Sequence, residues 1–173
     1  MNPAFLTFDK LEPGADVFVD ANIFIYHFLD LSADCSAFLE RIEEGAYRGT
    51  TSVFVLTEVL HRMMIMEAKA KNMVKTPGAL KKLAEKPDLV RRLVDYSTVA
   101  QVVPDMGIHV LPLTPAHVAA SQMVRARHGL LINDSLIVAL IRESGIANLA
   151  THDEAFCRVD GIRVFGPADI GRK

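Results

Sequence analysis

The sequence has few cysteines and no long apolar run. Cys35 and Cys157 are its only cysteines, too few for a disulfide framework or a Cys-based zinc site, which is typical of a reducing compartment. No apolar run approaches the roughly 20 residues that span a bilayer. The start, MNPAFLTFDK, also lacks the basic residues and continuous apolar stretch of a signal peptide. We therefore expect a soluble, cytoplasmic protein with no membrane partner.

Length and composition indicate one compact domain, because half of the 173 residues are apolar and the chain is short for two cores. The net charge of −2 is unevenly distributed. Residues 67–92 hold eight Lys or Arg and three acidic side chains, so this basic segment carries +5 and the remainder carries −7. Such a segment is typical of a solvated helix face or of a phosphate-binding surface, and composition leaves both open.

Hydrophobic patterning predicts short strands that alternate with helices. The strands are expected at 16–19, 48–51, 107–113, 147–150 and 162–165, and the main helices at 22–29, 35–45, 52–71, 115–127 and 133–144. Ser52 is the expected cap of the third helix, and Pro77, Gly78 and Pro87 divide the basic segment into two shorter helices. Short, continuous apolar strands between helices favour an α/β fold with a parallel sheet covered on both faces.

Two aspartates are expected directly beyond strand ends, where open α/β sheets bind their ligands. Asp20 interrupts the apolar run FVDANIFIY, and Asp153 follows the strand in NLATHD. An ionised carboxylate next to a buried strand needs a partner. Each could simply cap the helix that follows it, because a carboxylate accepts hydrogen bonds from free helix N–H groups.

Two further acidic residues lie on helices. Asp134 begins the helix NDSLIVALI, where an aspartate is common for helix-dipole reasons alone. Glu58 lies inside VFVLTEVLHR, so it cannot cap, and an ion pair with Arg62 four residues later is the alternative to a functional role.

Four carboxylates at one rim of a sheet would repel one another unless a cation lay between them. Mg²⁺ or Mn²⁺ prefers oxygen ligands and usually retains water molecules, one of which can act as a nucleophile. No spacing of His or Cys residues suits a structural zinc ion. His61 and His152 lie near the acids in sequence, but lone histidines are more often core or surface residues.

Four short motifs, in order along the chain, resemble those of the PIN-domain nucleases, and among them the VapC-type toxins of toxin–antitoxin pairs. They are DAN at 20–22, S-x-x-x-x-x-E at 52–58, NDSLIVAL at 133–140 and T-x-D-x-x-F at 151–156. The resemblance covers most of residues 16–165.

This resemblance implies a three-layer α/β/α fold with a central parallel sheet and helices on both faces. It also implies an endoribonuclease that hydrolyses phosphodiester bonds of single-stranded or structured RNA. The implied catalytic and metal-binding residues for Mg²⁺ or Mn²⁺ are Asp20, Glu58, Asp134 and Asp153, with Asn22, Ser52 and Thr151 as supporting polar groups. The family further implies an antitoxin protein as partner and a homodimer.

The chain is longer than a compact VapC toxin. We expect one PIN-like domain over 1–173, with a core at 16–165 and a basic helical insertion at about 66–105. RNA binding by Lys81, Lys82, Arg91 and Arg92 is our hypothesis for the insertion. Met63, Met64 and Met66 fit a core or a partner surface, and core packing is the favoured interpretation.

An aspartate at a strand end also occurs in proteins that transfer a phosphoryl group to it. Phosphoryl transfer to Asp20, as in haloacid-dehalogenase-like phosphatases, needs a second Asp where this chain has Asn22, and response-regulator receivers need a late lysine, which is absent between Lys86 and Lys173. The alternative to a nuclease is therefore a catalytically silent PIN-fold scaffold or binding module.

Overall fold

Six parallel strands form one sheet in the computed structural model, which describes residues 5–75 and 77–171. Their order across the sheet is β1-β6-β5-β2-β3-β4, and every adjacent pair is parallel. The strands are β1 (Leu6–Thr7), β2 (Asp16–Val19), β3 (Arg48–Ser52), β4 (His109–Leu111), β5 (Asn148–Ala150) and β6 (Arg163–Gly166). All five predicted strands are confirmed, and β1 is an addition at the edge.

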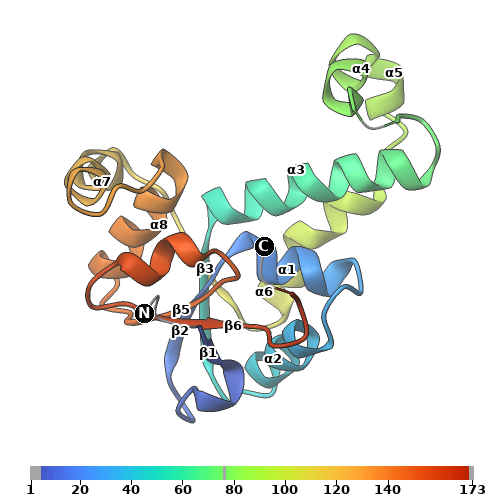
Figure 1. Ribbon diagram of the computed structural model, residues 1–173. Helices are drawn as coiled ribbons and strands as arrows, with labels where there is room; N and C mark the ends of the chain where they lie inside the picture. The colour runs from blue at the N-terminus through green and yellow to red at the C-terminus, as the bar shows by residue number, and fades with distance from the viewer. Residues whose placement is uncertain (1–4, 76, 172–173) are drawn as a thin grey trace.

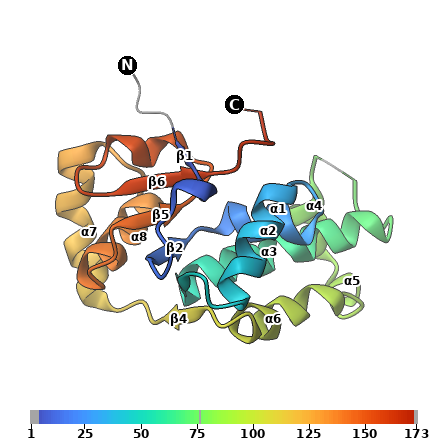
Figure 2. The ribbon, with the colours of Figure 1, turned by 90° about the horizontal axis from the view of Figure 1, so that it is seen from below.

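Helices cover both faces of the sheet, which confirms the three-layer α/β/α fold. Figure 2 shows α7 and α8 on one side of the strands, and α1, α2 and α6 on the other. The helices are α1 (Ala21–Phe28), α2 (Ala33–Glu43), α3 (Val53–Ala70), α4 (Ala79–Glu85), α5 (Pro87–Val90), α6 (Val99–Asp105), α7 (Pro115–His128) and α8 (Ile132–Glu143), with short 3₁₀ turns η1 (Phe8–Lys10), η2 (Asp95–Thr98) and η3 (Glu154–Arg158).

Burial on both faces explains the continuous apolar strands. Val17, Phe18 and Val19 of β2 are completely buried, as expected for a central strand of a covered parallel sheet. In α8, every residue from Ser135 to Ile141 is buried, because this helix is enclosed by the sheet and α7. The strongest apolar segments of the sequence therefore form the frame of the molecule.

Local polar residues set the helix boundaries. Ser52 ends β3 and caps α3, its Oγ accepting a 3.2 Å hydrogen bond from the Val55 N–H, as predicted. Ser32 caps α2 in the same way, so this helix begins two residues before the predicted start. Gly129 ends α7 in a left-handed conformation with φ of 64°, which a residue with a Cβ rarely adopts.

Residues 71–75 and 77–98, here called the arm, follow α3, and the part that holds α4 and α5 projects from the far end of this helix (Figure 1). They include the two short helices predicted for the basic segment, α4 and α5. The arm has a small hydrophobic core separate from the main one, formed by Ile65, Ala68, Val74, Ala79, Leu83 and Leu93. Met63 packs on the main core and Met64 on the arm's core. For these two methionines, the structure agrees with the favoured interpretation of core packing.

Glu67 attaches the arm to α3. Its side chain is 7% exposed and accepts hydrogen bonds from the Val94 N–H at 3.0 Å and the Tyr96 N–H at 2.9 Å. Lys71 Nζ contacts the same carboxylate at 2.5 Å and Asp95 at 2.9 Å. The end of the arm is thus held by one buried carboxylate.

The strand order reverses between β2 and β5. From β2 the chain moves outward through β3 to β4, whereas from β5 it moves through β6 in the opposite direction. Such a reversal leaves a crevice beyond the carboxyl ends of the two strands. Within the described residues, no helix is both long and apolar enough to cross a membrane.

Candidate active site

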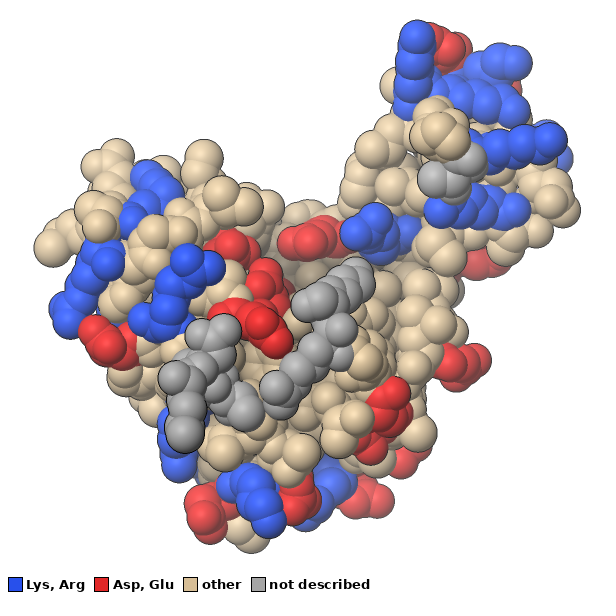
Figure 3. Space-filling model, in the orientation of Figure 1, with Lys and Arg blue, Asp and Glu red and all other residues tan. Residues whose placement is uncertain are grey.

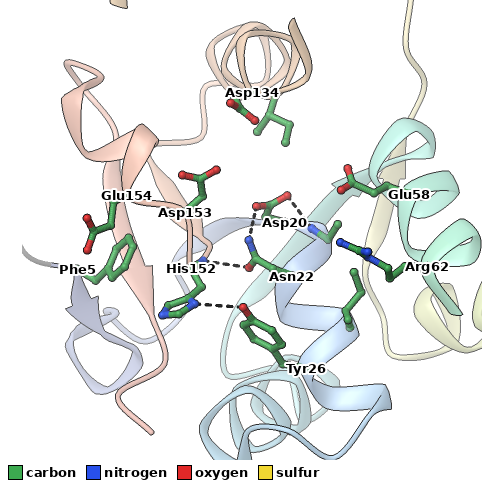
Figure 4. A pocket seen from close by; sticks show the side chains of 13 residues that line it. Phe5, Asp20, Asn22, Tyr26, Glu58, Arg62, Asp134, His152, Asp153 and Glu154 are labelled. Carbon is green, nitrogen blue, oxygen red and sulfur yellow. Dashed lines mark hydrogen bonds between the residues drawn. The ribbon is translucent and has the colours of Figure 1, made fainter. Parts of the chain in front are cut away.

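A pocket of about 520 Å³ lies at this reversal. The four acidic residues that the sequence singled out all line it, although they come from distant parts of the chain: Asp20, Glu58, Asp134 and Asp153. Figure 4 shows them arranged around one opening, and Figure 3 shows acidic side chains gathered in a hollow of the surface. The fold therefore brings the four carboxylates together around one cavity.

The backbone explains how each acid reaches the pocket. Asp20 directly follows β2 and caps α1, and Asp153 lies beyond β5 and caps η3. Glu58 extends from the second turn of α3 and Asp134 from the first turn of α8. The capping interpretation of the two strand-end aspartates is thus correct and compatible with a place in the pocket.

Asp20 is the most enclosed of the four, with 7% of its surface exposed. Its Oδ1 accepts a 2.7 Å hydrogen bond from the Ala21 N–H. Its Oδ2 accepts hydrogen bonds from Thr151 Oγ1 at 2.6 Å and from Asn22 Nδ2 at 2.8 Å. Both oxygens are therefore held in fixed positions.

Asn22 and Thr151 connect the ends of β2 and β5. Asn22 Nδ2 also donates to Thr151 Oγ1 at 2.9 Å, and Asn22 Oδ1 accepts from the His152 N–H at 3.0 Å. Thr151 Oγ1 accepts a further 3.1 Å hydrogen bond from the Asp153 N–H. The network orients Asp20 and the backbone of Asp153 relative to each other.

Two carboxyl groups of the pocket have raised pKa values. Burial raises the pKa of Asp20 to about 6, against the opposing effect of its hydrogen bonds, and the charges of Glu58 and Asp134 add to the rise. Burial likewise raises the pKa of Asp134, together with the charges of Asp153 and Glu58. The carboxylates therefore repel one another, and binding of a proton or a metal cation relieves this repulsion.

Glu58 and Arg62 both line the pocket, but they do not form the ion pair considered from the sequence. Among the residues that the structure describes, neither side chain has an ion pair or hydrogen bond. The Arg62 guanidinium instead extends toward the cavity (Figure 4). It brings an unneutralised positive charge to a wall of the acidic pocket.

The donor set suits a hard divalent cation, because all four side chains offer carboxylate oxygens. Across residues 5–75 and 77–171, however, no three His, Cys, Asp or Glu side chains are close enough together to share one metal ion. The arrangement therefore fits an ion held by one or two carboxylates with water completing its shell, as Mg²⁺ commonly is.

Other predicted residues lie away from the cavity. Ser52 is fully buried and caps α3. His61 is exposed on α3 outside the pocket lining. The four predicted RNA-binding residues are exposed in the arm: Lys81, Lys82, Arg91 and Arg92. Figure 3 shows Lys and Arg side chains spread over α4 and α5, well away from the acidic hollow.

Sequence reasoning missed several residues that line the pocket, namely Phe5, Ile25, Tyr26 and Glu154. It noted His152 beside the acids but favoured a core or surface position, and it considered Arg62 only as an ion-pair partner of Glu58. Residues four apart share one helix face, which places Arg62 beside Glu58. Phe5 and Tyr26 carried no such signal, because they reach the site only through the packing of β1 and α1.

Solved structures share the fold of this chain. No curated protein matches the chain. Among solved structures, the fold is similar to a chain of VapBC2 from Rickettsia felis bound to a DNA fragment from its promoter, with 15% identity, a TM-score of 0.55, and 88% of this chain and 98% of that chain covered. It is also similar to a toxin–antitoxin complex from Klebsiella pneumoniae, with 14% identity, a TM-score of 0.52, and 84% and 94% covered.

The sequence pattern of the PIN domain matches residues 17–162. This match runs from β2 to the last residue before β6 and includes all four acidic residues of the pocket. It spans far more than half of the chain. The chain therefore belongs to the PIN domain family.

Proposed function

We propose that the chain is a Mg²⁺- or Mn²⁺-dependent endoribonuclease that hydrolyses phosphodiester bonds of RNA. The observation that carries the proposal is the convergence of four carboxylates on one pocket at the β2–β5 reversal, with Asp20 buried and oriented. Capping α1 alone does not require the three further carboxylates around Asp20, whose pKa burial raises and whose acidic neighbours Glu58 and Asp134 raise it further.

Each side chain has a distinct role in this proposal. Asp20, Glu58, Asp134 and Asp153 hold the cation, directly or through water. Asn22 and Thr151 fix the Asp20 carboxylate through hydrogen bonds. The chemistry that a bound divalent cation supplies is activation of water for attack on phosphorus and stabilisation of charge on the phosphoryl oxygens.

Arg62 supplies a positive charge at a wall of the acidic pocket. An RNA phosphate entering between carboxylates meets repulsion, which a guanidinium on the same wall offsets through charge-assisted hydrogen bonds. In our proposal Arg62 contacts a phosphate of the bound RNA. Its lack of a partner among the described residues supports this role.

The arm adds a second RNA contact in this proposal. Lys81, Lys82, Arg91 and Arg92 are exposed, and nearby acids offset only part of their charge, since Lys81 faces Glu85 at 3.9 Å and Arg91 contacts Asp88. Exposed lysines and arginines bind backbone phosphates without reading sequence.

We also propose that the protein is the toxin of a type II toxin–antitoxin pair, acts in the cytoplasm, binds an antitoxin protein and forms a homodimer. The Klebsiella pneumoniae structure of similar fold is a toxin–antitoxin complex, which supports the proposal. Coexpression with the product of a neighbouring gene, followed by size-exclusion chromatography with light scattering, tests both assemblies.

The deciding experiment measures cleavage of a mixed single-stranded RNA with Mg²⁺, Mn²⁺ or EDTA. Wild type is compared with Asp20→Asn and Asp134→Asn, and with Asp105→Asn, which changes an exposed acid at the end of α6. We expect metal-dependent cleavage by wild type and Asp105→Asn only. Equal activity in all four proteins, or metal binding absent from wild type by calorimetry, would contradict the proposal.

A further inference from the structure

One wall of the pocket is aromatic. Phe5, Tyr26 and His152 line the cavity together with the acids, and these three residues are here called the aromatic wall. The ring centroids of Phe5 and His152 are 5.8 Å apart, and those of Tyr26 and His152 are 5.7 Å apart. All three side chains are partly exposed, so they present ring surface to the opening beside the carboxylates (Figure 4).

Hydrogen bonds connect the aromatic wall to the acidic residues. The His152 N–H donates to Asn22 Oδ1, and the amide of the same Asn22 donates to Asp20. His152 Nδ1 lies 3.2 Å from the Tyr26 hydroxyl. The hydrogen-bond network that orients the buried carboxylate therefore also orients the central ring of the wall.

Phe5 is positioned by a glycine. A Cβ placed on Gly166 would lie 3.3 Å from Phe5 Cγ and 2.9 Å from the Thr151 carbonyl oxygen. The missing side chain allows the ring to lie close over the end of β6. The edge strand β1, which pairs with β6 at Leu6 and Thr7, thus carries Phe5 to the mouth of the pocket.

A second cavity, of about 320 Å³, continues from the aromatic wall. It shares Phe5 and His152 with the acidic pocket, and none of the described residues that line it is acidic. An RNA strand that extends from the carboxylates in this direction would pass over the partly exposed rings. It would then enter a cavity with no acidic side chain among the described residues that line it. This environment suits a flat, uncharged ring system better than a phosphate.

We propose that the aromatic wall is a nucleobase subsite, on which the base next to the cleaved phosphodiester stacks. This inference rests on the proposed nuclease function and specifies its substrate as RNA with an unpaired base at the scissile position. Bases splayed out of single strands and loops stack on Phe, Tyr and His rings, whereas bases within a duplex are already stacked. The subsite thus selects single-stranded RNA or loops over duplex.

The test uses Asp134→Asn protein, which cannot cleave in our proposal and is altered on a wall of the pocket away from the rings. Short single-stranded RNA carrying 2-aminopurine at one position at a time reports stacking through fluorescence quenching. Phe5→Ala and Tyr26→Ala are added to this background. Tyr26→Phe, which keeps the ring, and Leu6→Ala, which trims an exposed neighbour on β1, are the matched controls, and circular dichroism verifies folding.

We expect quenching at one position and a loss of affinity of about tenfold for Phe5→Ala and Tyr26→Ala. Leu6→Ala should stay near the parent value, and Tyr26→Phe, which keeps the ring but loses the hydroxyl beside His152, should lose much less affinity than Tyr26→Ala. An abasic RNA at that position should weaken binding to the parent protein but add nothing to the loss in Phe5→Ala, because the two changes remove one contact. Duplex RNA should bind more weakly than the single strand.

Two results would overturn the inference in different ways. If the parent protein binds RNA and the ring variants bind it equally well, the stacking subsite is wrong and the proposed nuclease stands. If no RNA binds and wild-type protein cleaves none, both proposals fail together.

Discussion

Thr151 Oγ1 donates a 2.6 Å hydrogen bond to Asp20 Oδ2 across the point where the strand order reverses. The two residues are 131 positions apart in sequence. Thr151 itself is fully buried, so this bond lies away from water. It joins the end of β5 to the buried carboxylate at the end of β2.

Replacing Thr151 by Val should impair the site without enlarging the side chain. The change removes the donor that lowers the pKa of Asp20, so this pKa should rise further. We expect RNA cleavage to fall about 10–100-fold, the usual cost of losing a partner of a metal ligand, and its acid limb to move to higher pH. Thr151→Ser should retain most of the activity, and pH–rate profiles of the three proteins provide the measurement.

Metal affinity should depend on pH near 6. Protonation of Asp20 competes with the cation, and burial raises the pKa of this carboxyl group to about 6 in the metal-free protein. Affinity should therefore be nearly constant above pH 7 and fall by up to about tenfold per pH unit below 6. Calorimetric titration with Mn²⁺ between pH 5 and 8 measures this dependence. An affinity at pH 5 equal to that at pH 8 would refute it.

Arg62→Gln should weaken RNA binding and reduce its salt dependence. If Arg62 contacts one phosphate of single-stranded RNA, the slope of log affinity against log salt concentration should fall by about 0.7. His61→Gln is the matched control, because His61 is exposed on the same helix outside the pocket lining. Fluorescence anisotropy at several salt concentrations gives both slopes, and identical slopes would remove Arg62 from the binding surface.

Neutralising the basic side chains of the arm should have a larger effect on the same slope. Replacing Lys81, Lys82, Arg91 and Arg92 by Gln should lower the slope by up to about 3, at about 0.7 per single-strand phosphate contact. Removing the opposing acids by Glu85→Gln and Asp88→Asn should act in the other direction and tighten binding. Unchanged affinity and slope in the fourfold variant would reject the arm as an RNA contact.

Glu67→Gln should loosen the arm in a pH-dependent manner. Although burial opposes it, the hydrogen bonds from Lys71, Tyr96 and Val94 lower the pKa of Glu67 to about 2. The lowered pKa of Glu67 stabilises the fold above about pH 4.5 by about 3 kcal/mol, and this contribution disappears as the pH falls toward 2.

Amide hydrogen exchange at Val94 and Tyr96 is the direct measurement for the Glu67 variant. Exchange should be faster than in wild type at neutral pH, and the difference should shrink at acid pH. Glu85→Gln changes an exposed acid of the same arm and should leave the exchange of both amides unaltered. Protection that is equal in all three proteins at pH 7 would contradict the proposed attachment.

The frame of the fold was predictable because its signals are local. β2 and α8 are buried almost throughout, so their apolar runs specify them without knowledge of their neighbours. Ser52 and Gly129 mark helix ends through their own backbone and side-chain chemistry. β1 was missed because a strand of two residues owes its existence to pairing with β6, which no local pattern encodes.

The site was predictable where parallel topology does the positioning, and Glu58 and Asp134 on helices were predictable through their motifs. Residues that follow strands β2 and β5 must meet at one edge, so Asp20 and Asp153 could be assigned from their place in sequence. The ion pair of Glu58 with Arg62 stayed open as an alternative, because helix spacing alone does not tell which of two neighbours a long side chain faces. Phe5 is brought to the pocket by the close approach over Gly166, which is a tertiary contact.

The length of α3 has a consequence for the size of the substrate. The helix continues from Glu58, at the pocket, to Ala70, next to the arm, and these twelve steps correspond to about 18 Å along its axis. An uninterrupted helix keeps this separation constant. An RNA that touches both the carboxylates and the arm must therefore extend several nucleotides past the cleaved bond. If both proposed contacts bind RNA, shorter oligonucleotides reach the carboxylates but not the arm, and α3 sets a minimum substrate length for full affinity.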